Sequence, residues 1–140
     1  LLQPNQFNGV NLAGAGLASV QGTSFQSAQG ANIGPITVVS NTQPGSYRVS
    51  AYIQVVRAAT TSSTLPAITV NFSDGFVFTA QALALTPTNN GNTTTTFQEA
   101  VAMVSVQAAT NITYSTSGFA SVGATSMQYT LRVVCEYTGL

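Results

Sequence analysis

The clearest signal in this sequence is an alternation of apolar and polar positions over residues 46–56. A period of two residues is typical of a β-strand with one buried face. One face carries Tyr47, Val49, Ala51, Ile53 and Val55, and the other carries Arg48, Ser50, Tyr52, Gln54 and Val56. Residues 127–137 repeat the pattern, with an apolar face of Met127, Tyr129, Leu131, Val133, Cys135 and Tyr137. Both segments are predicted to be strands of firm register, because a slip by one residue would expose the whole apolar set.

Shorter runs of β-favouring residues lie between these two segments. The first, residues 67–73, ends at Asp74-Gly75, a dipeptide typical of tight hairpins, so residues 76–85 are expected to return antiparallel to it. Further strands are predicted over residues 97–107 and 111–115. No window shows an apolar stripe with the 3.6-residue period of a helix. The pattern therefore predicts about seven or eight short strands in an all-β, antiparallel β-sandwich.

The first 34 residues differ in texture from the rest of the chain. They carry no charged side chain, are dominated by Gly, Ala, Asn and Gln, and contain only scattered large apolar residues. Such a composition favours turns and extended segments over a packed core. We expect residues 1–34 to form an extended N-terminal arm or edge strands, and residues 35–140 to form the sandwich domain.

Charge is unusually scarce in this chain of 140 residues, because charged side chains make up 4% of it and a soluble domain usually has about 25%. The charged residues are Arg48, Arg57, Asp74, Glu99, Arg132 and Glu136, and their sum is zero. Histidine and lysine are absent, which removes imidazole proton shuttles, Schiff-base amines and the Ser-His-Asp triad. Cys135 stands alone, so it predicts neither a disulfide nor a zinc site. We expect a non-enzymatic protein with no catalytic residues, metal ligands or cofactor.

The same scarcity of charge bears on partners. Three arginines cannot neutralise a row of phosphates, so no nucleic acid is expected to bind, and no stretch approaches the roughly 18 apolar residues of a membrane-spanning helix. Keeping a free subunit of this size soluble with six charges is difficult. Much of its surface is therefore expected to be buried against copies of itself or against a larger particle.

Two segments resemble known jelly-roll proteins. Residues 44–53, Pro-Gly-Ser-Tyr-Arg-Val-Ser-Ala-Tyr-Ile, look like the strand that opens the core of complement globular-head and tumour-necrosis-factor-like jelly rolls. Residues 112–136 resemble the C-terminal half of small jelly-roll proteins of phage and bacterial genomes. The resemblance covers about residues 36–138, and it implies a jelly roll that forms a trimer about a threefold axis and has no enzymatic activity. The chain lacks the calcium-binding carboxylate clusters of the animal members.

The resemblance also implies an interface. In such trimers, the sheet that contains the strands starting near Ser46, Phe97 and Met127 turns its outer face toward the axis. The residues of this chain that would lie there are Arg48, Tyr52, Glu99, Arg132 and Glu136. Their two positive and two negative charges would suit buried pairs between chains that fix the register of assembly.

The leading hypothesis is a structural virion protein: a homotrimeric phage capsid decoration, or cement, protein that stabilises the shell. Its partners would be other copies of itself and the major capsid protein or another virion protein, and it would lie at the virion surface. A second hypothesis is an extracellular filament subunit assembled by N-terminal strand addition. A third is a trimeric fibre-tip or glycan-binding head at the cell surface, which would require exposed aromatic residues at the loop ends, where the sequence predicts none.

Overall fold

The structure, a computed structural model, describes residues 19–86 and 96–140. Within this part the chain forms ten β-strands. They are β1 (Ser19–Gln29), β2 (Ile36–Val39), β3 (Gly45–Arg57), β4 (Ser62–Thr64), β5 (Ala67–Ser73), β6 (Phe78–Ala82), β7 (Phe97–Val106), β8 (Ile112–Ser117), β9 (Ala120–Val122) and β10 (Gln128–Gly139). In the same residues there is no helix of the length and hydrophobicity needed to cross a membrane.

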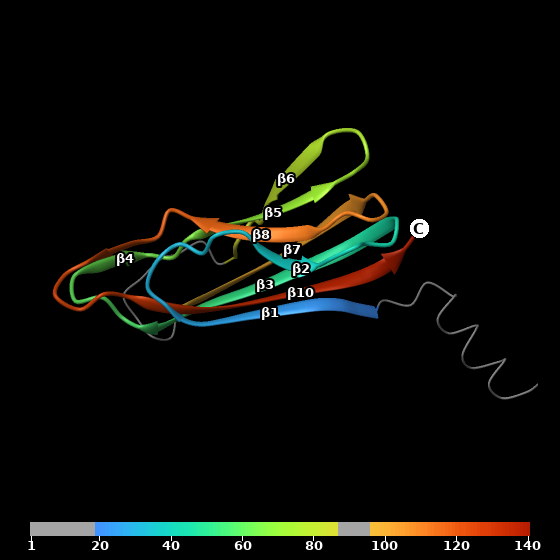
Figure 1. Ribbon diagram of the computed structural model, residues 1–140. Helices are drawn as coiled ribbons and strands as arrows, with labels where there is room; N and C mark the ends of the chain where they lie inside the picture. The colour runs from blue at the N-terminus through green and yellow to red at the C-terminus, as the bar shows by residue number, and fades with distance from the viewer. Residues whose placement is uncertain (1–18, 87–95) are drawn as a thin grey trace, which may run out of the picture.

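Two four-stranded antiparallel sheets pack face to face (Figure 1). The long sheet has the order β1-β10-β3-β7 and the short sheet the order β2-β8-β5-β6, while β4 and β9 pair as a small third sheet. Apart from the β5–β6 hairpin, which lies within the short sheet, successive strands of the two main sheets alternate between them, which is the arrangement of a jelly roll. The predicted all-β, antiparallel β-sandwich of jelly-roll type is therefore confirmed.

The two best-patterned segments lie side by side at the centre of the long sheet. β3 pairs with β10 over almost its whole length, from Arg57 opposite Gln128 to Ser46 opposite Gly139. The predicted apolar faces of both strands are buried, and the side chains of Ile53, Leu131 and Val133 are fully enclosed. Because both strands turn these residues toward the short sheet, their alternate residues form the outer face of the long sheet.

Three tyrosines in the core carry hydroxyl groups that all find partners. Tyr47 donates to the carbonyl of Gln43 at 2.9 Å and Tyr129 to the carbonyl of Ala31 at 2.8 Å. The Tyr114 hydroxyl lies 2.8 Å from the Ser24 hydroxyl, which links β8 in the short sheet to β1 in the long sheet. Buried polar groups of this kind are costly unless they are paired, so these contacts fix where the loops meet the core.

The described part of the predicted N-terminal arm belongs to the sandwich. β1 pairs with β10 from Ser19 opposite Tyr137 to Gln29 opposite Tyr129, and Ile33 lies in the core. β1 is an edge strand of the long sheet, and edge strands were one of the two alternatives for residues 1–34. The sandwich therefore begins before residue 35. Residues 1–18 lie outside the described residues.

The turn after β5 also differs from the expected tight hairpin. Ser73 pairs with Phe78, so residues 74–77 form a four-residue loop. The Asp74 carboxylate accepts hydrogen bonds from the backbone N–H groups of Phe76 at 2.9 Å and Val77 at 3.2 Å, which holds the loop in this longer form. β6 then returns antiparallel to β5, as predicted.

Candidate interaction surface

The outer face of the long sheet is unusually apolar for a surface of the molecule. The described part of the chain exposes eleven large hydrophobic side chains, and seven of them lie on this one face. They are Val20, Phe25, Tyr52, Val56, Phe97, Val101 and Met103. Single exposed hydrophobic residues are ordinary, whereas a group gathered on one sheet face is typical of an interaction site.

All five residues predicted for an interface lie on this face. Three of them form a row across the sheet, because Tyr52 on β3 stands opposite both Glu99 on β7 and Arg132 on β10. Arg48 and Glu136 stand opposite each other on β3 and β10, further along the same strands. The structure thus brings four of the six charges of the chain together on one surface.

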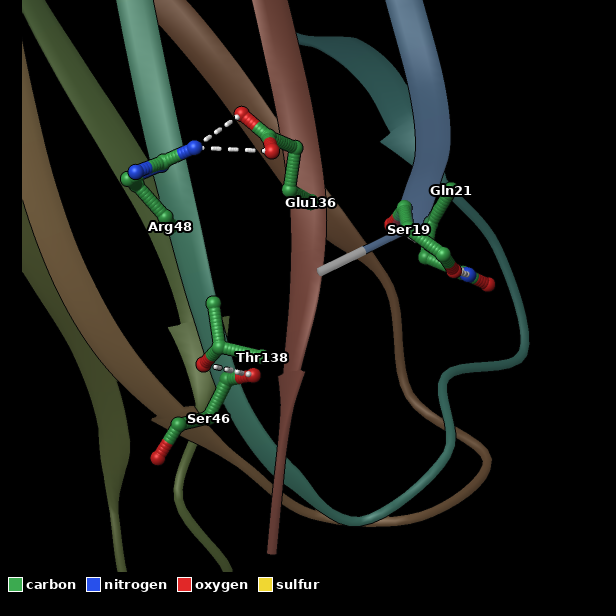
Figure 2. A network of polar contacts seen from close by, with 6 residues as sticks. All are labelled: Ser19, Gln21, Ser46, Arg48, Glu136 and Thr138. Atoms are coloured by element: carbon green, nitrogen blue, oxygen red, sulfur yellow. Dashed lines mark hydrogen bonds and ion pairs between the residues drawn. The ribbon is translucent and has the colours of Figure 1, made fainter. Parts of the chain in front are cut away.

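Arg48 and Glu136 bind each other within the chain. The Nη2 atom of Arg48 lies 2.9 Å from one Glu136 carboxylate oxygen and 2.8 Å from the other (Figure 2). Next to them, the Thr138 hydroxyl donates to the carbonyl of Ser46 at 3.0 Å, which adds a second contact between the strands. The Arg48 side chain is 46% exposed, so the pair contributes at most about 1 kcal/mol to stability. It serves the fold of one chain, whereas the sequence suggested pairs between chains.

Glu99 and Arg132 have no ionic partner within residues 19–86 and 96–140. The guanidinium carbon of Arg132 lies 5.1 Å from the centre of the Phe25 ring, a cation–π contact with β1. Between the two charges, Tyr52 stacks on Phe97 with ring centres 5.6 Å apart. The row therefore presents a cation and an anion with aromatic surface beside and between them.

A depression of about 550 Å³ lies over this row. Its outer-face lining comprises Ser50, Tyr52, Glu99, Val101, Arg132 and Val134, and its rim is formed by Ala84 and Thr86. Thr86 reaches this edge because its backbone exchanges two hydrogen bonds with Glu99, at 2.7 and 2.8 Å. The segment after β6 thus covers the edge of β7 at Glu99 and frames one side of the depression.

The two remaining charges stabilise loops. The Arg57 Nε atom donates to the carbonyl of Ser126 at 2.9 Å at the end of β3. The backbone N–H groups of Phe76 and then Val77 bind the Asp74 carboxylate and lower its pKa. In the described residues, no group of three or more potential metal ligands gathers. Arg57 and Asp74 therefore serve turn geometry.

The loop that Asp74 holds carries a second exposed apolar feature. The side chain of Phe76 is 91% exposed and that of Val77 is largely exposed. This loop ends the β5–β6 hairpin, which projects from the body of the sandwich (Figure 1). Sequence analysis expected no exposed aromatic residue at a loop end, and Phe76 corrects that expectation. The available signal was the pair of apolar residues directly after Asp74-Gly75, a turn where side chains point outward.

Comparisons with known proteins find distant likenesses among solved structures. No protein-family model and no curated protein matches the chain. Among solved structures, the chain is similar to one titled "Cyanophage Pam1 capsid asymmetric unit", with 19% sequence identity and a TM-score of 0.38. The alignment covers 87% of this chain and 85% of that chain. A likeness at this TM-score assigns no function to the chain.

Proposed function

We propose that this protein is a non-enzymatic structural component of a phage particle, a capsid decoration protein that assembles as a homotrimer and stabilises the shell. The phage setting comes from the resemblance of residues 112–136 to the C-terminal half of small jelly-roll proteins of phage and bacterial genomes. The structural role is supported by the molecule itself, because its charges serve turns and surfaces and its most distinctive feature is an uncovered apolar sheet face.

The observation that carries the proposal is the apolar outer face of the long sheet. Three copies that turn this face toward a common axis would remove Tyr52, Val101 and Met103 from water. Burial of apolar surface contributes about 25 cal/mol for each Å², which has to exceed the cost of removing the charges on the same face from water. Self-association also accounts for the low charge of the chain, because a surface buried between copies needs no charges to keep it soluble.

A decoration protein needs a second surface for the shell. In the proposed assembly this is the Phe76 tip, defined as Phe76 and Val77 on the β5–β6 loop, because it projects away from the body of the sandwich (Figure 1). Its partner would be the major capsid protein or another virion protein. An exposed aromatic side chain on a loop held by Asp74 is a suitable anchor for an apolar pocket, since aromatic residues are enriched among the residues that dominate interfaces.

The first test is the native mass of the purified chain at micromolar concentration. The proposal expects a particle of three times 14.4 kDa, in which Val101→Ser weakens association. Val122→Ser is the matched control, because Val122 on β9 is 55% exposed and Val101 is 64% exposed, yet Val122 lies outside the long sheet. A clean monomer, or equal effects of the two substitutions, would contradict the proposal, and an open-ended ladder of masses would favour the filament alternative.

The second test concerns the shell. Empty phage shells that lack the protein should bind the wild-type chain, and Phe76→Ser should reduce that binding while leaving the native mass unchanged. Because Phe76 is almost fully exposed, this substitution should leave the stability of the subunit within about 0.5 kcal/mol of wild type. Unchanged binding of the Phe76→Ser variant would remove the tip from the proposal.

Phe76 also favours a second candidate function, the trimeric fibre tip or glycan-binding head. An exposed aromatic ring at a loop end is the feature that such a head requires. This candidate predicts that the wild-type chain binds host cells or a panel of cell-surface glycans and that Phe76→Ser abolishes the binding. Binding to shells without binding to cells or glycans would reject it.

A further inference from the structure

Four of the six charged side chains have polar partners inside the chain. Arg48 binds Glu136, Arg57 binds a backbone carbonyl, and Asp74 binds two backbone N–H groups. In the described ranges, Glu99 and Arg132 are the remaining two, and neither makes an ion pair. In a chain with so few charges, Glu99 and Arg132 are informative, since they are opposite in sign and share one face.

The sheet geometry keeps Glu99 and Arg132 apart within one subunit. They stand at the same level of the sheet, on β7 and β10, with Tyr52 of β3 directly between them. Neighbouring strands are about 4.8 Å apart, so the two backbones are separated by about 10 Å. The intervening Tyr52 side chain, stacked on Phe97, occupies the space over β3. Each charge is therefore free to meet an opposite charge from outside the subunit.

We propose that Glu99 of one copy forms an ion pair with Arg132 of a neighbouring copy, across the outer faces of two long sheets. The inference rests on the self-association proposed above, and it names the contact that sets the register of that assembly. A second copy is the partner that fits, because the face carries one unpaired anion and one unpaired cation and is complementary to itself. A strongly acidic or basic partner would leave one of the two charges facing a like charge.

The shared level of the two residues suits rotational symmetry. A rotation about an axis parallel to the strands leaves every residue at its own height along that axis. Glu99 at the β7 side of one face then arrives at the level of Arg132 at the β10 side of the next. One such pair forms at each of three interfaces around a threefold axis. A sheet that slid by two residues along its neighbour would lose all three pairs.

The residues around the proposed Glu99–Arg132 ion pair make it a determinant of specificity. Val101 beside Glu99 and Phe25 beside Arg132 are apolar and would exclude water when the faces meet. Partial desolvation strengthens the attraction between the charges but also raises its cost, so the net gain in affinity is modest. A wrong register places an unpaired charge against apolar surface, which is strongly unfavourable. The apolar residues thus supply affinity and the ion pair supplies register.

A charge-reversal cycle tests the inference. The variants are Glu99→Arg, Arg132→Glu and the double reversal, compared with wild type by native mass spectrometry and by the concentration dependence of sedimentation at low salt. Each single reversal should raise the dissociation constant by about tenfold or more, and the double reversal should return it to within about threefold of wild type. The effects should shrink at 1 M salt, because ions screen exposed charges.

The control is Val122→Arg, which adds a charge at an exposed position of β9 outside the long sheet and should leave the assembly unchanged. If a single reversal fails to fold, Glu99→Gln and Arg132→Gln replace the reversals, and each should weaken association of a folded subunit. If the double reversal associates as weakly as the summed effects of the two single reversals predict, the ion pair between copies is wrong, although the proposed self-association still holds. A wild-type chain that stays monomeric would overturn the proposed assembly and the pair with it.

A crosslinking measurement supplies independent support. A mixture of Glu99→Cys chains and Arg132→Cys chains should be joined between subunits by a short bismaleimide, giving covalent dimers of unlike chains in a denaturing gel. Cys135 is fully buried and does not compete for the reagent in the folded protein. Moving one cysteine to the opposite end of the face, as in Glu99→Cys with Ser46→Cys, should reduce the yield sharply. Equal yields from the two designs would contradict the proposed register.

Discussion

At the residue scale, each charge in this protein has an identifiable surrounding. Asp74 accepts two backbone hydrogen bonds and shapes the loop that exposes Phe76. Arg132 lies over the ring of Phe25 and so connects the central strand β10 to the edge strand β1. These contacts differ in what they contribute. Exposed ion pairs add little to stability, whereas hydrogen bonds that cap loops and cation–π contacts also fix local geometry. Few charges therefore suffice to define both loops and the outer face.

Cys135 gives the first prediction, because it is a thiol enclosed in the core. Burial, with a smaller contribution from the charge of Glu136, raises the pKa of the Cys135 thiol to about 12, compared with about 9 for an exposed thiol. The neutral thiol is inert, so a thiol reagent at pH 8 should modify the folded protein about 100-fold more slowly than the protein unfolded in urea. Equal labelling rates in the two states would show that β10 opens readily.

The same shift predicts a loss of stability at alkaline pH. A group whose pKa is higher in the folded state than in the unfolded state contributes fully to stability at pH values below its unfolded pKa. That contribution is lost as the pH rises toward the pKa of the folded state. The urea midpoint should therefore be constant between pH 7 and about pH 9 and fall between pH 9 and pH 12. Burial also raises the pKa of Tyr114 and Tyr129, so a Cys135→Ala variant should show a shallower fall that persists. The substitution itself should cost about 1–2 kcal/mol at pH 7.

At the element scale, the strands that sequence could predict are those whose apolar pattern matches their burial. β3 and β10 as far as Cys135 meet this condition, which is why their faces can be predicted residue by residue. β1 does the opposite, because its buried side chain is the polar Ser24 and its large apolar side chain, Phe25, is exposed. Ser24 is satisfied by Tyr114 on another sheet, and Phe25 by Arg132. Neither partner can be found from the local sequence pattern, so the sequence leaves an extended arm and edge strands as alternatives for residues 1–34.

The residues of the candidate surface could be predicted from strand alternation, but their partners could not. Strand alternation places Arg48, Tyr52, Glu99, Arg132 and Glu136 on outward positions, and the pairing of the strands puts them on one face. Which charges pair within the chain depends on register between strands far apart in sequence. A shift of the β3–β10 register would have given Arg48 a different partner. The sequence therefore indicated the set of residues, and only the fold separates the internal pair from the two free charges.

Gly22 gives a prediction about how the two sheets meet. An added Cβ at Gly22 would overlap the carbonyl oxygen of Val38, because β1 and β2 approach closely at this point. Gly22→Ala should therefore destabilise the protein by about 2–3 kcal/mol in urea unfolding. Gly34→Ala is the matched control, since an added Cβ there meets nothing within 4 Å and should change stability by less than about 1 kcal/mol. Similar losses from the two substitutions would contradict the close approach of β1 to β2.

At the scale of the whole molecule, the jelly roll separates the surfaces that the proposed function needs. The outer face of the long sheet lies on one side, and the Phe76 tip projects from the short sheet (Figure 1). A trimer built on the first surface would leave three tips available to a shell. Self-association and shell binding should therefore be separable by mutation, Val101→Ser affecting the first and Phe76→Ser the second.

Truncation at the N-terminus gives the last prediction, because β1 begins at Ser19, within the block predicted as an arm or edge strands. Removing residues 1–34 deletes β1, and with it the pairing to β10, the Ser24–Tyr114 hydrogen bond and the Phe25–Arg132 contact. The exposed edge of β10 would then be prone to pair with other chains, so this truncation should aggregate or unfold. Removing residues 1–18 leaves every described contact in place, and we expect a folded subunit of the same oligomeric state, with a melting temperature within a few degrees of wild type.

Shell binding separates the roles that the N-terminal residues could have. If residues 1–18 reach onto neighbouring subunits, the shorter truncation should keep its native mass but dissociate from shells at lower denaturant concentration than the full chain. The Val122→Ser variant of the full chain provides the reference for an unrelated surface change. Identical retention of the truncated and full chains would assign shell binding to the sandwich alone, and loss of the trimer on truncation would move the first 18 residues into the subunit interface.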